Sequence, residues 1–113
     1  MTYEQIATMV AEIGYPNAYF QFDHDGETPT PFICFYYPGI DDLYADSSNY
    51  QRITELIIEL YSNTKNFDAE ATVEQKLQEH GLTYSKYEEY IEGEKLYEVV
   101  YEMEVLINAE SGE

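Results

Sequence analysis

The chain has 113 residues, of which 44% are hydrophobic and 16% aromatic, enough to build a core within one domain. It carries 23 acidic and 5 basic residues, for a formal charge of −18. This imbalance argues against binding nucleic acid through phosphate contacts, because neutralising phosphates requires many lysines and arginines. The classes that remain are a partner of basic proteins, the wall of a channel for DNA, and a chain that imitates the charge of DNA.

The first segment, Thr2 to Ile13, predicts a helix. Its apolar residues recur at helical spacing, and Thr2 with Gln5 fits a capping box. Gly14 followed by Pro16 is a stop signal, so we expect the helix to end at Ile13.

The next apolar segments predict strands. Residues 18–23 alternate in hydrophobicity, and residues 32–37 form a continuous run, FICFYY, typical of a central strand covered on both faces. Between them, residues 24–31 are rich in Gly, Pro and polar side chains and predict a loop. The acidic stretch 38–49 has no periodicity and is long for a connector, so we expect a functional loop there.

The segment 50–62 fits either a helix or a strand by periodicity. Leu56, Ile58 and Leu60 match one strand face, but the apolar residues also match a helix face. We favour a strand, because Ile, Thr and Tyr are enriched there. A second helix is predicted from Asp68 to His80, with Asp68 as its capping acid, more acids in its first turns and Gly81 as its stop.

The C-terminal part predicts a hairpin, with strands at 82–91 and 95–107 joined by a turn at 92–94. The second strand alternates, with an apolar side made of Tyr97, Val99, Tyr101, Met103, Val105 and Ile107. Its other side carries Glu98, Glu102 and Glu104, which repel one another. We expect residues 108–113 to form a frayed tail.

The element order α-β-β-β-α-β-β predicts a single α+β domain over residues 1–113. Its sheet is expected to be mainly antiparallel, with about five strands and two helices packed on one face. The chain has no basic leader and no apolar run long enough for a membrane span, so we expect neither secretion nor a membrane partner.

No catalytic, cofactor-binding or metal-binding motif stands out. The stretch DHDGE at 23–27 has the oxygen ligands of a calcium loop but not its spacing, so an exposed turn is the simpler interpretation. Cys34 lies in an apolar run and is interpreted as a small buried hydrophobe. We therefore expect a protein that is not an enzyme and uses no cofactor.

Thirteen tyrosines are the more unusual feature, because tyrosine is enriched at protein interfaces. Some of them are candidates for the core, namely Tyr36, Tyr37 and Tyr97. The candidates for an interface, together with two acids of the predicted loop, are Asp41, Asp42, Tyr44, Tyr50, Tyr87 and Tyr90.

Several stretches resemble, in order and spacing, a family of phage proteins: MTYEQIATMVAEIG, TPFICFYYP, YQRITELIIELYSNTKNFDAEATVEQKL and LTYSKYEEYIEGEKLYEVVYEMEVLI. The chain is similar to the tail completion or tail terminator proteins, which join head and tail in long-tailed phages and prophages of Gram-positive bacteria. The resemblance implies a structural virion protein that forms a ring, commonly a hexamer. Its implied partners are copies of itself, the major tail protein and the head connector proteins, and its implied location is the virion, reached from the host cytoplasm.

The face with Glu98, Glu102 and Glu104 has three interpretations. The first is that it repels DNA passing through a ring, the second that it contacts a basic partner, and the third that it is only solvated. We expect no sequence-specific contact with nucleic acid. The alternative function is an acidic DNA mimic, a phage-encoded inhibitor that blocks a nucleic-acid-binding enzyme of a host defence system.

Overall fold

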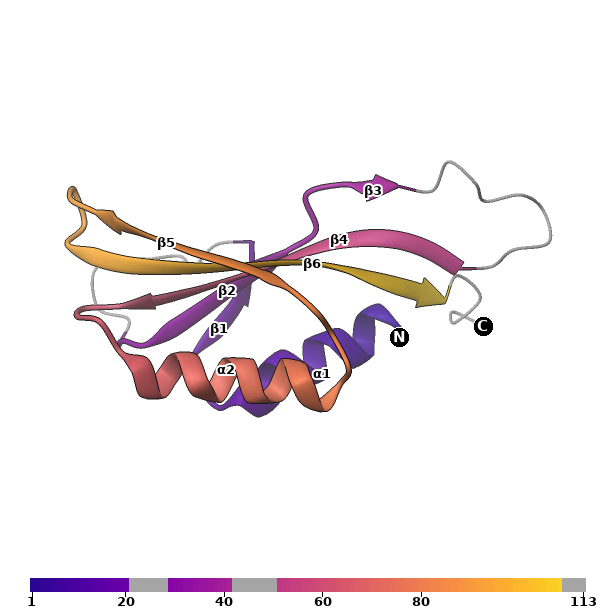
Figure 1. Ribbon diagram of the computed structural model, residues 1–113, viewed down its shortest axis with the longest axis horizontal. Coiled ribbons are helices and arrows are strands. Elements are labelled where there is room, and N and C mark those ends of the chain that lie inside the picture. The colour runs from indigo at the N-terminus through magenta and orange to yellow at the C-terminus, as the bar shows by residue number, and fades with distance from the viewer. Residues whose placement is uncertain (21–28, 42–50, 109–113) are drawn as a thin grey trace.

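The computed structural model describes residues 1–20, 29–41 and 51–108. The helices and strands are α1 (Tyr3–Ile13), β1 (Asn17–Tyr19), β2 (Phe32–Tyr36), β3 (Ile40–Asp41), β4 (Gln51–Ser62), α2 (Phe67–Glu79), β5 (Ser85–Ile91) and β6 (Leu96–Asn108). Figure 1 shows both helices on the same side of one twisted sheet. In the part of the chain that the structure describes, neither helix is long and apolar enough to span a membrane.

Within the described ranges the sheet has six strands, in the order β1-β2-β4-β6-β5, and β3 pairs with β4 beside this path. The β1–β2 pair is parallel, and the other described pairs are antiparallel. This confirms the predicted α+β class with a mainly antiparallel sheet and helices on one face, although the parallel pair makes the sheet mixed. The short strand β3 lies in the segment that the sequence predicts as loop.

Helix α1 begins and ends where its sequence signals lie. The Thr2 side chain accepts a hydrogen bond from the Gln5 backbone N–H, and the Gln5 side chain accepts one from the Thr2 N–H. This confirms the capping box, which satisfies two N–H groups that lack a partner within the helix. Gly14 ends the helix with φ 102, a left-handed conformation that suits glycine.

Helix α2 begins slightly earlier than its acids indicate. Asn66 is the N-cap, and its side chain accepts a hydrogen bond from the Ala69 N–H at 3.0 Å. Asp68 therefore lies in the first turn, where its charge suits the helix dipole without capping the end. The helix ends at Glu79, and Gly81 follows with φ 71.

Residues 51–62 form a strand, as we favour from the sequence. Strand β4 lies between β2 and β6, so neighbouring strands can pair with its backbone on both sides. Leu56, Ile58 and Leu60 are buried beneath the helices, which leaves Ile57, Glu59 and Tyr61 on the opposite face. A helix here would have left the centre of the sheet empty.

The first predicted strand is shorter than expected in the part that the structure describes. Strand β1 ends at Tyr19, because Phe20 takes φ 73, outside the extended region. The Phe20 N–H still donates to the Phe35 carbonyl at 2.7 Å. The rest of the predicted strand, with the DHDGE stretch, lies outside the described residues.

The main core lies between the helices and the sheet. Ile6 and Met9 of α1 and Val73 and Leu77 of α2 are fully buried against it. The predicted apolar side of β6 supplies Val99, Tyr101, Met103, Val105 and Ile107, whereas Tyr97 is only half-buried. A smaller apolar cluster of Phe32, Cys34 and Leu96, with Tyr61 beside it, lies on the other face of the sheet.

A network of ion pairs ties α2 to β5. Glu70 of α2 has a side chain that is only 5% exposed, and it contacts Lys65 at 2.7 Å and Lys86 at 2.9 Å. Burial raises the pKa of Glu70, but the hydrogen bonds from the two lysines outweigh burial and hold the pKa below its usual range. Lys86 also contacts Glu74, which accepts a hydrogen bond from the Tyr101 hydroxyl.

Candidate functional site

The face of the sheet that the helices leave uncovered is strongly acidic. Because side chains alternate along each strand, the carboxylates on this face come from three strands in register. We call these residues the acidic face: Glu55, Glu59, Glu89, Glu98, Glu102 and Glu104. Among the described side chains of β4, β5 and β6, the cationic one is Lys86, and it lies on the other face against α2.

Strand pairing brings like charges opposite each other on the acidic face. Glu55 pairs with Glu104, and Glu89 pairs with Glu98. The Glu55 N–H donates to the Gly39 carbonyl at 3.2 Å, away from β6, so Glu55 and Glu104 form a pair without hydrogen bonds between them. In antiparallel sheets such pairs hold their side chains closest together. The strand register therefore places like charges together, and neither pair contains a cation that would offset the repulsion.

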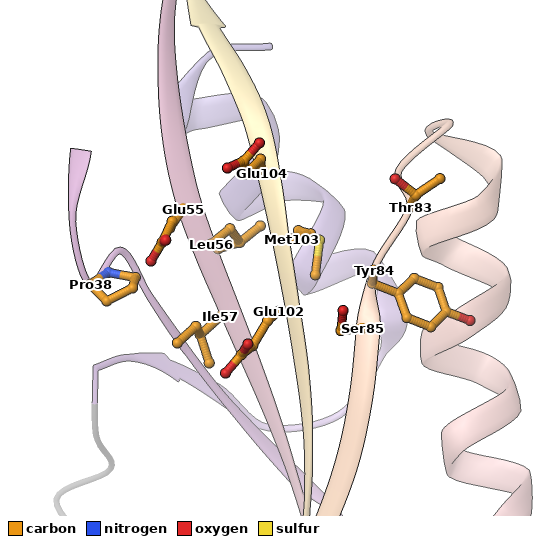
Figure 2. A pocket seen from close by; sticks show the side chains of 10 residues that line it. All are labelled: Pro38, Glu55, Leu56, Ile57, Thr83, Tyr84, Ser85, Glu102, Met103 and Glu104. Atoms are coloured by element: carbon orange, nitrogen blue, oxygen red, sulfur yellow. The ribbon is translucent and has the colours of Figure 1, made fainter. Parts of the chain in front are cut away.

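A groove of about 580 Å³ runs over the acidic face. Figure 2 shows the carboxylates of Glu55, Glu102 and Glu104 above β4 and β6, between Pro38 on one side and the start of β5 on the other. We call this the acidic groove. Its full lining is Pro38, Glu55, Leu56, Ile57, Thr83, Tyr84, Ser85, Glu102, Met103 and Glu104.

Beside the groove, two tyrosines and two glutamates form a hydrogen-bonded cluster. The Tyr36 hydroxyl donates to Glu59 at 3.1 Å. The Tyr61 hydroxyl lies 2.8 Å from Glu59 and 3.0 Å from Glu98. A hydroxyl has one proton, so Tyr61 satisfies one of these carboxylates at a time.

The cluster changes the acidity of its members. Burial, together with the nearby charge of Glu59, raises the pKa of Glu98 to about 7. Burial and the same carboxylate raise the pKa of Tyr36 to about 12, and they raise the pKa of Tyr61 above its usual range. Glu98 therefore holds a proton in part near neutral pH, whereas both tyrosines stay neutral hydroxyl donors.

The three glutamates predicted from the β6 alternation share one face, but they differ in surroundings. Glu102 and Glu104 are exposed and line the acidic groove. Glu98 is partly buried and bonded to Tyr61, so it belongs to the cluster beside the groove.

The two predicted interface tyrosines that the structure describes, Tyr87 and Tyr90, lie on opposite faces of β5. Tyr87 lies on the acidic face, and its hydroxyl donates to Glu102 at 3.1 Å, a bond that raises the pKa of Tyr87. Tyr90 lies on the helix side of β5, edge-on against Tyr97 with ring centroids 5.0 Å apart. Asp41 belongs to β3, and Asp42, Tyr44 and Tyr50 lie outside the described residues.

The sequence argument missed Glu55, Glu59 and Tyr61 as parts of this surface. Their signal is the alternation of β4, in which every second residue from Glu55 to Tyr61 faces away from the buried leucines. Once β4 is known to pair with β6, the two acidic strand faces coincide. The missing information was the register, which no single strand contains.

A second hollow lies by the β1 edge and is aromatic. It has a volume of about 650 Å³ and is lined by Tyr3, Ala7, Tyr19, Phe35, Tyr37 and Gly39. Tyr3 packs edge-on against Tyr37, and Tyr19 packs against both Phe35 and Tyr37. Tyr19 is 52% exposed and the neighbouring Phe20 is 60% exposed, so this edge presents aromatic surface to solvent.

Within the described ranges, no group of three or more His, Cys, Asp or Glu side chains has the arrangement to hold a metal ion. No protein-family model matches the chain, and no curated protein matches it. The functional interpretation therefore depends on the geometry of the two surfaces and on the residue pattern.

Proposed function

We propose that this chain is a non-enzymatic structural protein of a long-tailed phage, a ring-forming tail terminator or head-tail joining subunit. The observation that carries the proposal is the acidic face, where carboxylates gather on one side of the sheet with no described cation among them. A surface of this kind repels DNA phosphates, as the wall of a DNA channel must. The resemblance of the chain to tail terminators supports the same role.

The aromatic edge supports the self-association that a ring needs. Tyr19 and Phe20 expose about half of their surface at one end of the sheet, and β5 forms the opposite edge. A head-to-tail contact between different edges generates a closed ring when the rotation closes. We propose that copies of the chain meet in this way, in a hexamer that also contacts the major tail protein and the head connector within the virion.

The test is the association state across concentration. Sedimentation velocity and negative-stain electron microscopy of the purified protein should show ring-sized species at high concentration. Tyr19→Ser with Phe20→Ser should weaken association by about tenfold, because it removes the exposed aromatic surface. The control is Phe67→Ser, because Phe67 is 71% exposed and lies on α2 rather than on an edge strand.

A protein that stays monomeric up to millimolar concentration would contradict the ring. The proposed contact at the β1 edge would also be contradicted if Phe67→Ser weakened association as much as the double variant does, because the contact would then not lie at that edge.

A second candidate is the acidic DNA mimic, which the shape of the molecule favours. The molecule is elongated, with extents of 48 × 26 × 23 Å. On β6, Glu102 and Glu104 are two residues apart, which places successive carboxylates about 7 Å apart along one strand. A mimic would remain monomeric or dimeric and displace DNA from a basic DNA-binding protein, so the association experiment separates the two functions.

A further inference from the structure

We propose that the free edge of β6 beyond Glu102 binds an extended, basic segment of a partner protein as an added antiparallel strand, with its cation over the acidic groove. This inference rests on the proposed role of the acidic face as a joint, and it specifies the chemistry of the partner. Strand addition requires accessible backbone groups on β6 and side chains that select the partner. It also requires a reason why a second copy of this chain is not the occupant.

The free edge follows from the strand register. Strand β5 pairs with β6 only as far as Ser85, which lies opposite Glu102. Strand β4 continues along the other side of β6 as far as Asn108. Figure 1 shows β4 and β6 running on together after β5 has turned away towards α2. In the described part of the chain, no strand covers residues 103–108 of β6 on the side where β5 would lie.

The hydrogen bonds show which backbone groups point towards the free edge. The Leu106 carbonyl accepts a bond from the Met1 amino group at 2.9 Å, so Leu106 directs its backbone away from β4. The Glu55 N–H donates to Gly39, so its partner Glu104 also directs its backbone away from β4. Backbone groups alternate along a strand, and these two residues agree with that rule. The Leu106 carbonyl is held by the Met1 amino group, so an added strand displaces Met1 there. The remaining unpaired N–H and C=O groups on a strand edge are a template for another strand.

The side chains at this edge select what can pair with it. A residue placed opposite Glu104 meets a carboxylate that already faces Glu55, so a lysine or arginine there relieves a like-charge pair. A residue placed opposite Leu106 meets a leucine that is 49% exposed, so an apolar side chain fits there. In an antiparallel strand these residues are two apart, in the order apolar, any residue, basic.

Charge argues against a second copy of this chain as the occupant. The chain has 5 basic residues and a formal charge of −18. Lys86, the described cation of the strands β4 to β6, is held by Glu70 and Glu74. A basic partner protein is complementary to the acidic groove, whereas a second copy adds repulsion.

The experiment uses a capped peptide of the order Thr-Val-Thr-Arg-Thr, titrated into the intact protein and followed by NMR. Binding should shift the amide signals of Glu104 and Leu106 and slow their hydrogen exchange. Methylating the peptide nitrogens of Val and Arg should weaken binding by about tenfold, because these N–H groups face β6 in the antiparallel register. Methylating the threonine nitrogens should leave the affinity within about twofold.

Variants of the protein test the charge. Glu104→Lys should weaken binding of the peptide by about tenfold, whereas the control Glu94→Lys, in the exposed β5–β6 turn, should not. Equal losses for both methylated peptides, or for both variants, would show non-specific attraction and overturn the inference, as would absence of binding. If the peptide fails while the protein forms rings, strand addition is wrong and the proposed function stands; if both fail, both are wrong.

Discussion

Glu98 is the residue where burial, charge and hydrogen bonding act together. It lies opposite Glu89 on the neighbouring strand, near Glu59, and within hydrogen-bond distance of the Tyr61 hydroxyl. Tyr61 offers one proton to two carboxylates, so a proton on Glu98 completes the cluster. The pKa of Glu98 rises because the charged form loses water and meets other charges.

The raised pKa of Glu98 predicts how stability depends on pH. The pKa of Glu98 is about 7 in the folded state, against the ordinary value of 4.5 in the unfolded chain. The folded state therefore loses stability as the pH rises from 4.5 to about 7, because the unfolded chain gives up this proton first. Glu98→Gln removes this cost. The free energy of unfolding at pH 8 should rise by about 1 to 3 kcal/mol relative to wild type, with little change at pH 4.5.

Urea denaturation at both pH values checks this difference. The control is Glu92→Gln in the exposed β5–β6 turn, which should shift neither curve. A variant that is less stable than wild type at pH 8 would show that the ionised carboxylate is favourable in the cluster.

Thr54 gives a second prediction at the scale of one residue. It is fully buried in β4, and its hydroxyl has no hydrogen-bond partner among the described residues. Thr54→Val replaces the hydroxyl with a methyl group of similar shape, so it should stabilise the protein by about 1 kcal/mol. Thermal unfolding measures the change, and a lower melting temperature would show that the hydroxyl is bonded.

At the scale of elements, Glu70 is the more buried of the two glutamates, Glu70 and Glu74, that pair α2 with Lys86 of β5. Its carboxylate is buried and bonded to two lysines from different segments, Lys65 and Lys86. Glu70→Ala should therefore lower the free energy of unfolding by about 1 to 3 kcal/mol, less than for a fully buried pair because both lysines are partly exposed. Because the pKa of Glu70 is lowered in the folded state, protonation removes this stabilisation as the pH falls below 4.5.

The matched control for this prediction is Glu79→Ala at the end of α2. Glu79 pairs with Lys76 at 3.2 Å, but half of its side chain is exposed. Its removal should change stability by less than about 0.5 kcal/mol, because exposed ion pairs contribute little. Equal losses at Glu70 and Glu79, measured by urea denaturation, would show that burial of the pair does not matter.

Local patterns predicted most of the elements. The capping box and Gly14 give the ends of α1, and the alternation of β6 gives its buried side, because these signals lie within a few residues of one another. Strand β1 and the N-cap of α2 were less predictable, because the turn at Phe20 and the choice of Asn66 over Asp68 follow from how the chain packs. The acidic groove depends on pairing between β4 and β6, which are far apart in sequence.

At the scale of the whole molecule, charge and apolar surface are separated. The helix side carries the core and the described ion pairs of Lys65, Lys76 and Lys86, whereas the open side of the sheet gathers glutamates. The exposed aromatic residues Tyr19 and Phe20 lie at the β1 edge of the sheet. The β1 edge, which the proposed ring uses for association, is therefore separate from the acidic face.

Reversal of charge in the acidic groove tests whether the acidity acts in function. Glu55, Glu102 and Glu104 are on the face away from the main core, so their joint replacement by lysine should leave the fold intact. The control replaces Glu79, Glu92 and Glu94 by lysine, which changes the net charge equally at exposed sites on α2 and in the β5–β6 turn. Circular dichroism checks that both variants fold.

The most direct measurement is electron microscopy of particles from a phage whose copy of this gene has been deleted. We expect DNA-filled heads and separate tails, with joined particles restored by the wild-type chain and by the control variant but not by the charge-reversed groove. Complete particles with joined tails after deletion would contradict the proposed function. Restoration by the charge-reversed variant would show that the acidic groove is not the working surface.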